Sequence, residues 1–132
     1  MKNKILILLM LISVCSVLGQ ITELKYLRHD HNYSTTYSYD VTEITIHSDS
    51  TYTLRTWMLN NKKEWKSYNK YKPEINSGKI TKNGEFYTLF ELRNGNKTDF
   101  DWTVKITDRR LNFYYPDEKG KLRISAKYKR IK

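Results

Sequence analysis

The chain has few of the residues that cross-link or interrupt a fold. Its single cysteine is Cys15, and a cut after Gly19 would leave the rest of the chain without a thiol. No disulfide would then support the domain, even in a compartment that permits one. Proline occurs only twice, and there is no internal repeat, low-complexity segment or linker. The 132 residues leave room for one domain, which must fold on its hydrophobic core alone.

Catalytic motifs are also missing. The chain has no Gly-x-Ser-x-Gly elbow and no glycine-rich loop that would cradle a phosphate. Its carboxylates fall in expected turns or on solvated strand faces, where no partner prepares them for acid–base work. We therefore expect a protein that is not an enzyme and needs no cofactor. The remaining catalytic hypotheses use Glu91 or the pair His29 and His31.

The N-terminus predicts export. Two lysines in the first four residues precede an unbroken apolar run, Ile5–Val14, which is too short to span a bilayer. A buried helix of a soluble domain would show polar residues at helical spacing, and this run has none before Ser13. A cut between Gly19 and Gln20 makes residues 1–19 a helical signal peptide. Residues 20–132 would then form the mature domain, in the periplasm or outside the cell.

Cys15 permits a second interpretation of this segment. In bacterial lipoproteins a cysteine after the apolar run becomes the lipidated first residue of the mature protein. Such signals usually place a small residue just before the cysteine, and Val14 occupies that position here. We favour cleavage after Gly19, and expect membrane contact only if Cys15 carries a lipid anchor.

From residue 40 onward the pattern is that of β-strands. Apolar and polar residues alternate, most regularly at Phe100, Trp102, Val104 and Ile106. This period of two predicts a sheet with one buried and one solvated face. Strands are predicted near 42–46, 52–58, 77–81, 85–92, 100–106, 111–115 and 122–128. In the last strand the pattern places Leu122, Ile124, Ala126 and Tyr128 on a single face.

Short turns separate these strands and favour closure of the sheet. Asn83-Gly84 is the strongest turn signal, since both residues tolerate the positive φ of a type I′ turn. One or two further strands are expected before Tyr39. The irregular segment 59–74 is expected to be a loop or ragged hairpin near the barrel mouth, with another strand around Trp65–Tyr71. Seven or eight antiparallel strands predict an all-β, up-and-down barrel or a barrel-like meander, because closure protects exposed edges.

Several short motifs resemble those of the small secreted lipocalin-like proteins of bacteria. Ile44–Leu54 is similar to their apolar strand and Asp-Gly-Thr-Tyr turn, with Ser50 where glycine is usual. Ser77–Leu89 is similar to their Gly-x-Trp hairpin, with Ile80 in place of tryptophan. The resemblance covers residues 41–130 and lacks the Gly-x-Trp that often opens the barrel. It implies a single lipocalin-like barrel, and a fold alone does not determine a function.

Aromatic residues outside the regular strands suggest a binding surface. The chain holds 11 Tyr, 3 Trp and 4 Phe. Core packing explains those on regular strands, whereas Trp57, Trp65, Tyr68 and Tyr71 lie in or beside irregular polar segments. Amphipathic aromatics near a barrel mouth suit stacking on a ligand or contact with a protein. Half-buried tyrosines of a Tyr-rich surface are the alternative. We take these four residues and Tyr87 as candidate ligand contacts.

Glu91 is the sixth candidate ligand contact. It shares a strand face with Tyr87 and Leu89. If that face lines the barrel, Glu91 would orient a ligand. If it faces outward, Glu91 is part of the solvated surface, and we favour the outward placement.

His29 and His31 form the only pattern that suggests a metal. Residues two apart in a strand face the same way, so both rings would reach one ion, with His47 or Asp40 as a third ligand. A polar N-terminal loop explains the pattern equally simply. With no cysteine and no second histidine pair, we expect no metal.

The chain is basic, with a formal charge of +10. Such a charge raises anionic lipid, polysaccharide or nucleic acid as partners, but export argues against nucleic acid. The basic residues are scattered in sequence and dense only in 127–132, so we interpret most of them as solubilising. The first function hypothesis is an exported binding module for a small apolar or amphipathic ligand. The second is an envelope interaction protein or inhibitor, with a packed barrel and a basic aromatic surface.

Overall fold

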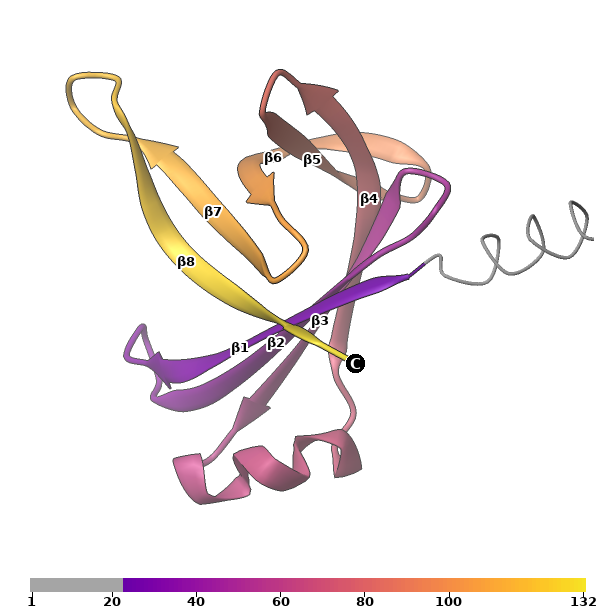
Figure 1. Cartoon of the computed structure of the whole chain (residues 1–132). Coiled ribbons are helices and arrows are strands. Elements are labelled where there is room, and N and C mark those ends of the chain that lie inside the picture. Colours follow the sequence, from indigo (N-terminus) through magenta and orange to yellow (C-terminus); the bar gives the residue numbers. More distant parts are fainter. Residues whose placement is uncertain (1–22) are drawn as a thin grey trace, which may run out of the picture.

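The protein is a closed β-barrel. The computed structural model describes residues 23–132; the expected signal peptide, with Cys15 and the Gly19–Gln20 cut, lies outside the described residues. Eight antiparallel strands follow one another around the barrel in chain order (Figure 1). This confirms the predicted all-β, up-and-down barrel. The elements are β1 (Leu24–Asn32), β2 (Ser38–Ile46), β3 (Thr51–Leu59), η1 (Lys62–Lys70), β4 (Glu74–Asn83), β5 (Phe86–Arg93), β6 (Asn96–Ile106), β7 (Arg110–Pro116) and β8 (Leu122–Ile131).

Strand alternation gives the first strands two apolar faces. Tyr26 belongs to a cluster inside the barrel, while its neighbour Leu27 packs in a second cluster on the outside. Neighbouring residues of a strand point to opposite faces, so the same strands contribute to one cluster inside the barrel and to another outside it. The inner core consists of Tyr26, Ile44, Tyr52, Leu89, Val104, Leu111 and Tyr128. The outer cluster consists of Tyr39, Val41, Trp57 and Leu59, with Leu27, Trp65 and Tyr68 packed against it.

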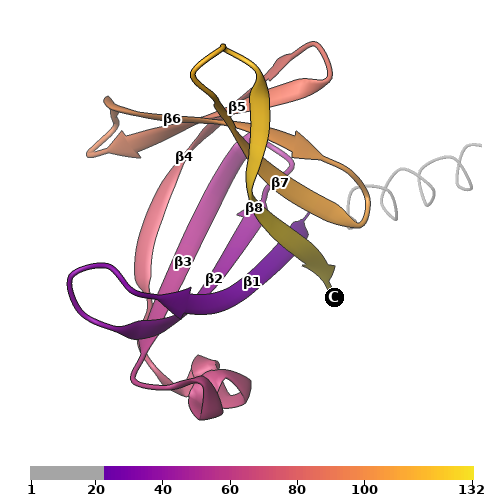
Figure 2. The same ribbon diagram turned by 90° about the vertical axis from the view of Figure 1, so that its left-hand side faces the viewer.

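The irregular segment between β3 and β4 forms a 3-10 helix. The strand expected around Trp65–Tyr71 is therefore wrong. Asn61 caps the helix, because its side-chain oxygen accepts a hydrogen bond from the backbone N–H of Lys63 at 2.9 Å. Figures 1 and 2 show η1 beside the far ends of β1, β2 and β3, not inside the barrel. Its tryptophan and tyrosine cover the outer cluster, which a bare sheet would leave in water.

The hairpin turns depart from the expectation in one detail. Asn94 and Gly95 both have positive φ, at 53° and 79°, and form the two-residue loop that a type I′ turn requires. At the stronger sequence signal, Asn83 pairs with Phe86, so the loop consists of Gly84 and Glu85. Only Gly84 has positive φ there, which makes the type I′ prediction for Asn83-Gly84 wrong.

β-bulges shift some apolar residues off the core. The pairing of β5 with β6 is irregular between Phe90 and Leu92, and Phe100 on this stretch of β6 stacks on Trp102 but is 59% exposed. A second irregularity skips Ser125, so Ala126 pairs with Phe113 and Ile124 with Tyr114. An extra residue reverses the alternation beyond it. Leu122 and Ile124 are exposed for this reason, and the predicted single apolar face of β8 is confirmed only for Ala126 and Tyr128.

Gly78 allows β4 to approach its neighbours closely. A Cβ there would overlap the carbonyl oxygen of Phe90 and lie 2.8 Å from Cε1 of Tyr52. Gly78 pairs with Tyr52 on one side and Glu91 on the other, inside the barrel. The missing side chain makes room for the Tyr52 ring.

The two ends of the barrel and its seam differ. At the turn end lie the β2–β3, β4–β5 and β6–β7 turns; at the helix end lie η1 and the β1–β2, β5–β6 and β7–β8 connections. The seam between β1 and β8 is the shortest pairing. It holds three residue pairs, from Lys25↔Ile131 to Leu27↔Lys129, against nine between β1 and β2. Beyond Leu27 the two strands diverge toward the helix end (Figure 1).

Candidate binding surfaces

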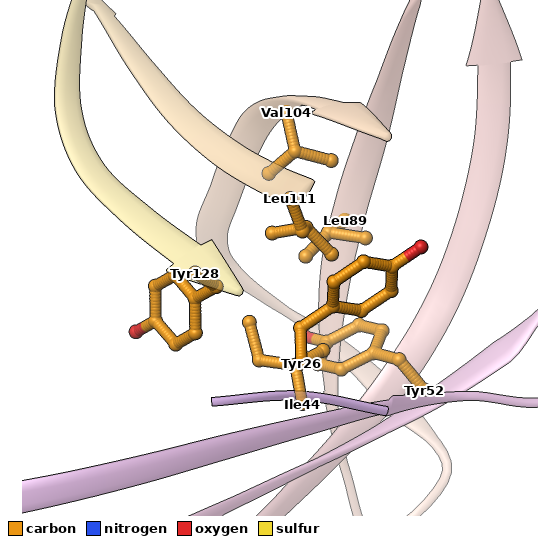
Figure 3. Packing of buried hydrophobic residues seen from close by; sticks show 7 residues of the cluster. All are labelled: Tyr26, Ile44, Tyr52, Leu89, Val104, Leu111 and Tyr128. Carbon is orange, nitrogen blue, oxygen red and sulfur yellow. The ribbon is translucent and has the colours of Figure 1, made fainter. Parts of the chain in front are cut away.

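Side chains fill the middle of the barrel. Figure 3 shows Tyr26, Ile44 and Tyr52 projecting from one side of the barrel toward Leu89, Leu111 and Val104 from the other. All seven residues of the inner core are no more than 6% exposed. Tyr26 closes the turn end further, since its hydroxyl donates a hydrogen bond to the carbonyl oxygen of Thr107 at 2.7 Å. The interior is a packed core of the kind expected in a small barrel.

A buried carboxylate and a buried hydroxyl adjoin this core. Glu91 is only 5% exposed, so the outward, solvated placement favoured by the sequence is wrong. Its carboxylate accepts hydrogen bonds from Thr98 Oγ1 at 3.1 Å and Arg93 Nη2 at 3.4 Å. Burial and the nearby Glu91 charge raise the pKa of Tyr52 to about 12. The Tyr52 hydroxyl has no partner in the described protein, which makes it a costly group to bury. Glu91 is held by Thr98 and Arg93.

A small recess, called here the mouth recess, opens at the turn end. Its volume is about 210 Å³, below the ~300–1,000 Å³ of sites for drug-sized ligands. Tyr87 is the only one of the six candidate ligand contacts that lines it. The other lining residues are Leu24, Ile46, His47, Ser50, Ile80, Lys82 and Ile106. The recess is apolar at its base and carries Lys82 at its rim.

The remaining aromatic candidates lie at the opposite end, outside the barrel. Trp57 is 6% exposed, meets Tyr68 edge-on with ring centroids 4.7 Å apart, and donates its indole N–H to the carbonyl oxygen of Tyr71 at 3.0 Å. Burial, with a smaller effect of the Glu43 charge, raises the pKa of Tyr68. These residues attach η1 to the sheet. They are not gathered with Tyr87 and Glu91 in one pocket.

Trp65 and His29 form the exposed edge of this outer cluster. Their rings stack with centroids 3.9 Å apart and planes inclined by 12°. His29 Nδ1 is 2.6 Å from the hydroxyl of Tyr39. Burial lowers the pKa of His29, and the positive charges of Lys62 and Lys129 lower it further. Lys129 lines a groove together with His29, and Lys62 lines a hollow together with Trp65.

The histidines do not assemble a metal site in the described part of the chain. His31 Nδ1 contacts the hydroxyl of Tyr37 at 3.0 Å, and His47 contacts Glu23 and Thr53 at the turn end. Asp40 accepts hydrogen bonds from Asn32 and Ser38 instead of facing a histidine. Among residues 23–132, no three His, Cys, Asp or Glu side chains are grouped to hold an ion.

Basic residues from three elements gather around the His29–Trp65 stack. A groove of about 200 Å³ between β1 and β8 is lined by Leu27, Arg28, His29, Lys127 and Lys129. An open hollow over η1 is lined by Lys62, Lys63, Trp65 and Lys66. The ring stack joins the groove and the hollow. We call this surface the basic aromatic face; its members are Arg28, His29, Lys62, Lys63, Trp65, Lys66, Lys127 and Lys129.

The face has few counter-charges of its own. Asp30 pairs with Arg28 at 3.2 Å, and Glu64 Oε2 accepts a hydrogen bond from the backbone of Asn60. Six lysine and arginine side chains thus line the groove and the hollow, which the His29–Trp65 stack connects. The lysines are far apart in sequence, so only barrel closure, which places β8 beside β1, brings them together. The prediction that the basic residues are merely scattered missed this clustering.

Comparison with protein-family models, with curated proteins and with solved structures gives no match. No helix among residues 23–132 is long and apolar enough to cross a membrane. Function is therefore inferred from the geometry of the chain itself.

Proposed function

We propose that this is an exported, lipocalin-like interaction protein that binds an acidic partner protein through the basic aromatic face. The observation that carries the proposal is the contrast between a barrel filled by the inner core and a clustered basic surface outside it. The closed eight-stranded barrel supports the lipocalin-like assignment, and the N-terminal pattern supports export. No catalytic step is part of the proposal.

The chemistry of the face suits an acidic protein surface. Lysine side chains provide long-range attraction and steer association, while a tryptophan supplies apolar contact area at the centre. Each exposed ion pair contributes little, about 0–1 kcal/mol, so several must act together with the aromatic contact. A basic protein that relied on charge alone would bind any polyanion. Contact with Trp65 would make the binding depend on the shape of the partner's surface as well.

Binding of poly-L-glutamate, a simple acidic probe, tests this proposal. Isothermal titration at low salt is expected to show binding that weakens steeply between about 50 and 200 mM salt. The double variant Lys62→Glu/Lys66→Glu should weaken binding at least tenfold, a loss of about 1.4 kcal/mol. The matched control Lys79→Glu/Lys82→Glu makes the same charge change on β4 and should keep wild-type affinity. Equal losses in both double variants would refute a dedicated face.

The mouth recess supports a second candidate function, the binding of a small apolar group. Its base is lined by Leu24, Ile46, Ile80 and Ile106. Native mass spectrometry of the protein purified from its own host separates the two candidates. A reproducible small extra mass that survives gentle desalting, and disappears in Ile80→Lys, would favour the recess. Protein that carries no small extra mass but retains a protein partner would favour the basic aromatic face.

A further inference from the structure

The seam between β1 and β8 leaves two strand edges without a partner in the described chain. Pairing stops at Leu27↔Lys129, so Arg28–Asn32 of β1 pair only with β2. On the other side, β8 from Leu122 to Lys127 pairs only with β7. Figure 1 shows β8 rising away from β1 over this stretch, and the groove lined by Leu27 and Lys127 lies where the strands part. Free strand edges are templates for a further strand.

We infer that the groove accepts an extended acidic segment of the partner protein, which adds as a strand along the free edge of β8. This inference rests on the proposed function and specifies how the partner binds. The free edge, Leu122–Lys127, spans about 20 Å at ~3.3 Å per residue, enough for a peptide of six residues. Backbone hydrogen bonds would supply affinity, and side chains on the two sides of the peptide would supply specificity.

The charge of the groove indicates which strand would pair with the free edge of β8. Lys127 and Lys129 line the groove on β8, and Arg28 and His29 line it on β1. Edge lysines commonly prevent sheets from joining, and two copies of this edge would bring like charges together. The same lysines attract a strand that carries Glu or Asp. An acidic segment of another protein therefore fits the edge, whereas a second copy of this chain does not.

Exposed apolar side chains give the added strand something to pack on. Leu122 is 38% exposed and Ile124 is 44% exposed, both on the free part of β8, and Tyr115 on β7 is 50% exposed. Leu27 lies at the base of the groove. The bulge at Ser125 places Leu122 and Ile124 on the same side of β8 as Lys127, so side chains on that side of an added acidic strand would meet both the lysine and the apolar groups.

The test uses an isotope-labelled sample of the whole exported protein and two capped synthetic decapeptides. One alternates Glu and Val, and the other replaces every Val by Pro, which keeps the charge but prevents strand formation. With the Glu-Val peptide, amide hydrogen exchange is expected to slow by at least tenfold within 122–127 of β8. The Glu-Pro peptide is expected to cause no slowing. Lys127→Glu should weaken Glu-Val binding about fivefold, since it turns an attraction of the size of one exposed ion pair into a repulsion. Lys119→Glu, in the β7–β8 loop, is the matched control.

The outcomes separate the two proposals. If both peptides bind equally and no amide of β8 becomes protected, strand addition is refuted, while the basic aromatic face is retained as an electrostatic site. If neither peptide binds at millimolar concentration and low salt, and poly-L-glutamate also fails to bind, both proposals are refuted. If poly-L-glutamate binds without either peptide binding, strand addition alone is refuted. If the Glu-Val peptide protects residues 84–86 at the turn end instead, the location is wrong.

Discussion

The inner core and the outer cluster lie on opposite faces of the first three strands, and they differ in what surrounds them. The inner core is enclosed by all eight strands, and its members are at most 6% exposed. The outer cluster is covered by one 3-10 helix, and its edge, the His29–Trp65 stack, meets solvent and lysines. The enclosed face leaves only the small mouth recess at the turn end, whereas the partly covered face combines apolar area with charge.

The largest loss of folding stability is expected for a substitution at Gly78, where the inner core is most tightly packed. Gly78→Ala should destabilise the protein by about 3 kcal/mol or more, because the added Cβ would overlap the Phe90 carbonyl and press on the Tyr52 ring. Urea unfolding followed by circular dichroism measures the change. Gly84→Ala, at a positive φ with open space around it, should cost only about 1 kcal/mol. Similar losses for both variants would mean that the interior is looser than described.

An alkaline titration examines the same region through Tyr52. The folded protein holds this phenol proton to a pKa of about 12, while the unfolded chain releases it near 10. Between these values the unfolded state is favoured increasingly, so stability should fall by about 2–3 kcal/mol as the pH rises from 10 to 12. Tyr52→Phe should lose less over this window, and should gain about 1 kcal/mol at pH 7 by removing an unpartnered hydroxyl. Tyr33→Phe, which changes an exposed ring, is the control.

A smaller effect is expected at the outer cluster. Trp65→Ala removes the stack on His29 and part of the cover over Trp57, and should cost about 1–2 kcal/mol. Trp65→Phe should restore most of the stability, because a ring can still stack. Thermal unfolding gives the comparison. A loss as large as that of Gly78→Ala would contradict the view that the outer cluster is only partly enclosed.

The smallest change in stability is expected from the protonation of His29. Its lowered pKa means that the folded state resists protonation that the unfolded chain accepts near pH 6.5, so this contribution to stability should decline as the pH falls below that value. Asp30 opposes the shift, and Lys62 and Lys129 add to it. The ring signals of His29 followed by NMR should titrate below the unperturbed value. Lys62→Gln should move the midpoint upward, and no movement would place Lys62 away from the stack.

Local chemistry explains which parts of the fold are predictable from the sequence. Period-two alternation at Phe100–Ile106 and the turns at 48–50 and 94–96 depend on neighbouring residues, and the strands they predict are present. The register errors at Leu122 and Ile124 come from a bulge, which depends on the partner strand. The helix at 62–70 packs Trp65 and Tyr68 on the outer cluster. This contact joins residues from separate strands, so the sequence around 62–70 does not predict it.

The candidate site was less accessible to sequence reasoning. Trp57, Trp65 and Tyr68 are expected near the barrel mouth, but they pack together outside the barrel, beside η1. Glu91 was misplaced because alternation defines two faces without saying which is inside. The basic aromatic face depends on closure between β1 and β8, because Arg28 and Lys127 are 99 positions apart in the chain.

The most direct test of the central claim is a pair of titrations followed through the backbone amides of one labelled sample. Poly-L-glutamate serves as the acidic probe and decanoate as the apolar one. Poly-L-glutamate is expected to shift the amide signals of β1, η1 and β8 around His29, Trp65 and Lys129, and to leave those of Leu89 and Val104 unchanged. Decanoate should leave the inner core unchanged as well. Saturable shifts at Leu89 and Val104 with decanoate, and none around Trp65 with poly-L-glutamate, would contradict the central claim.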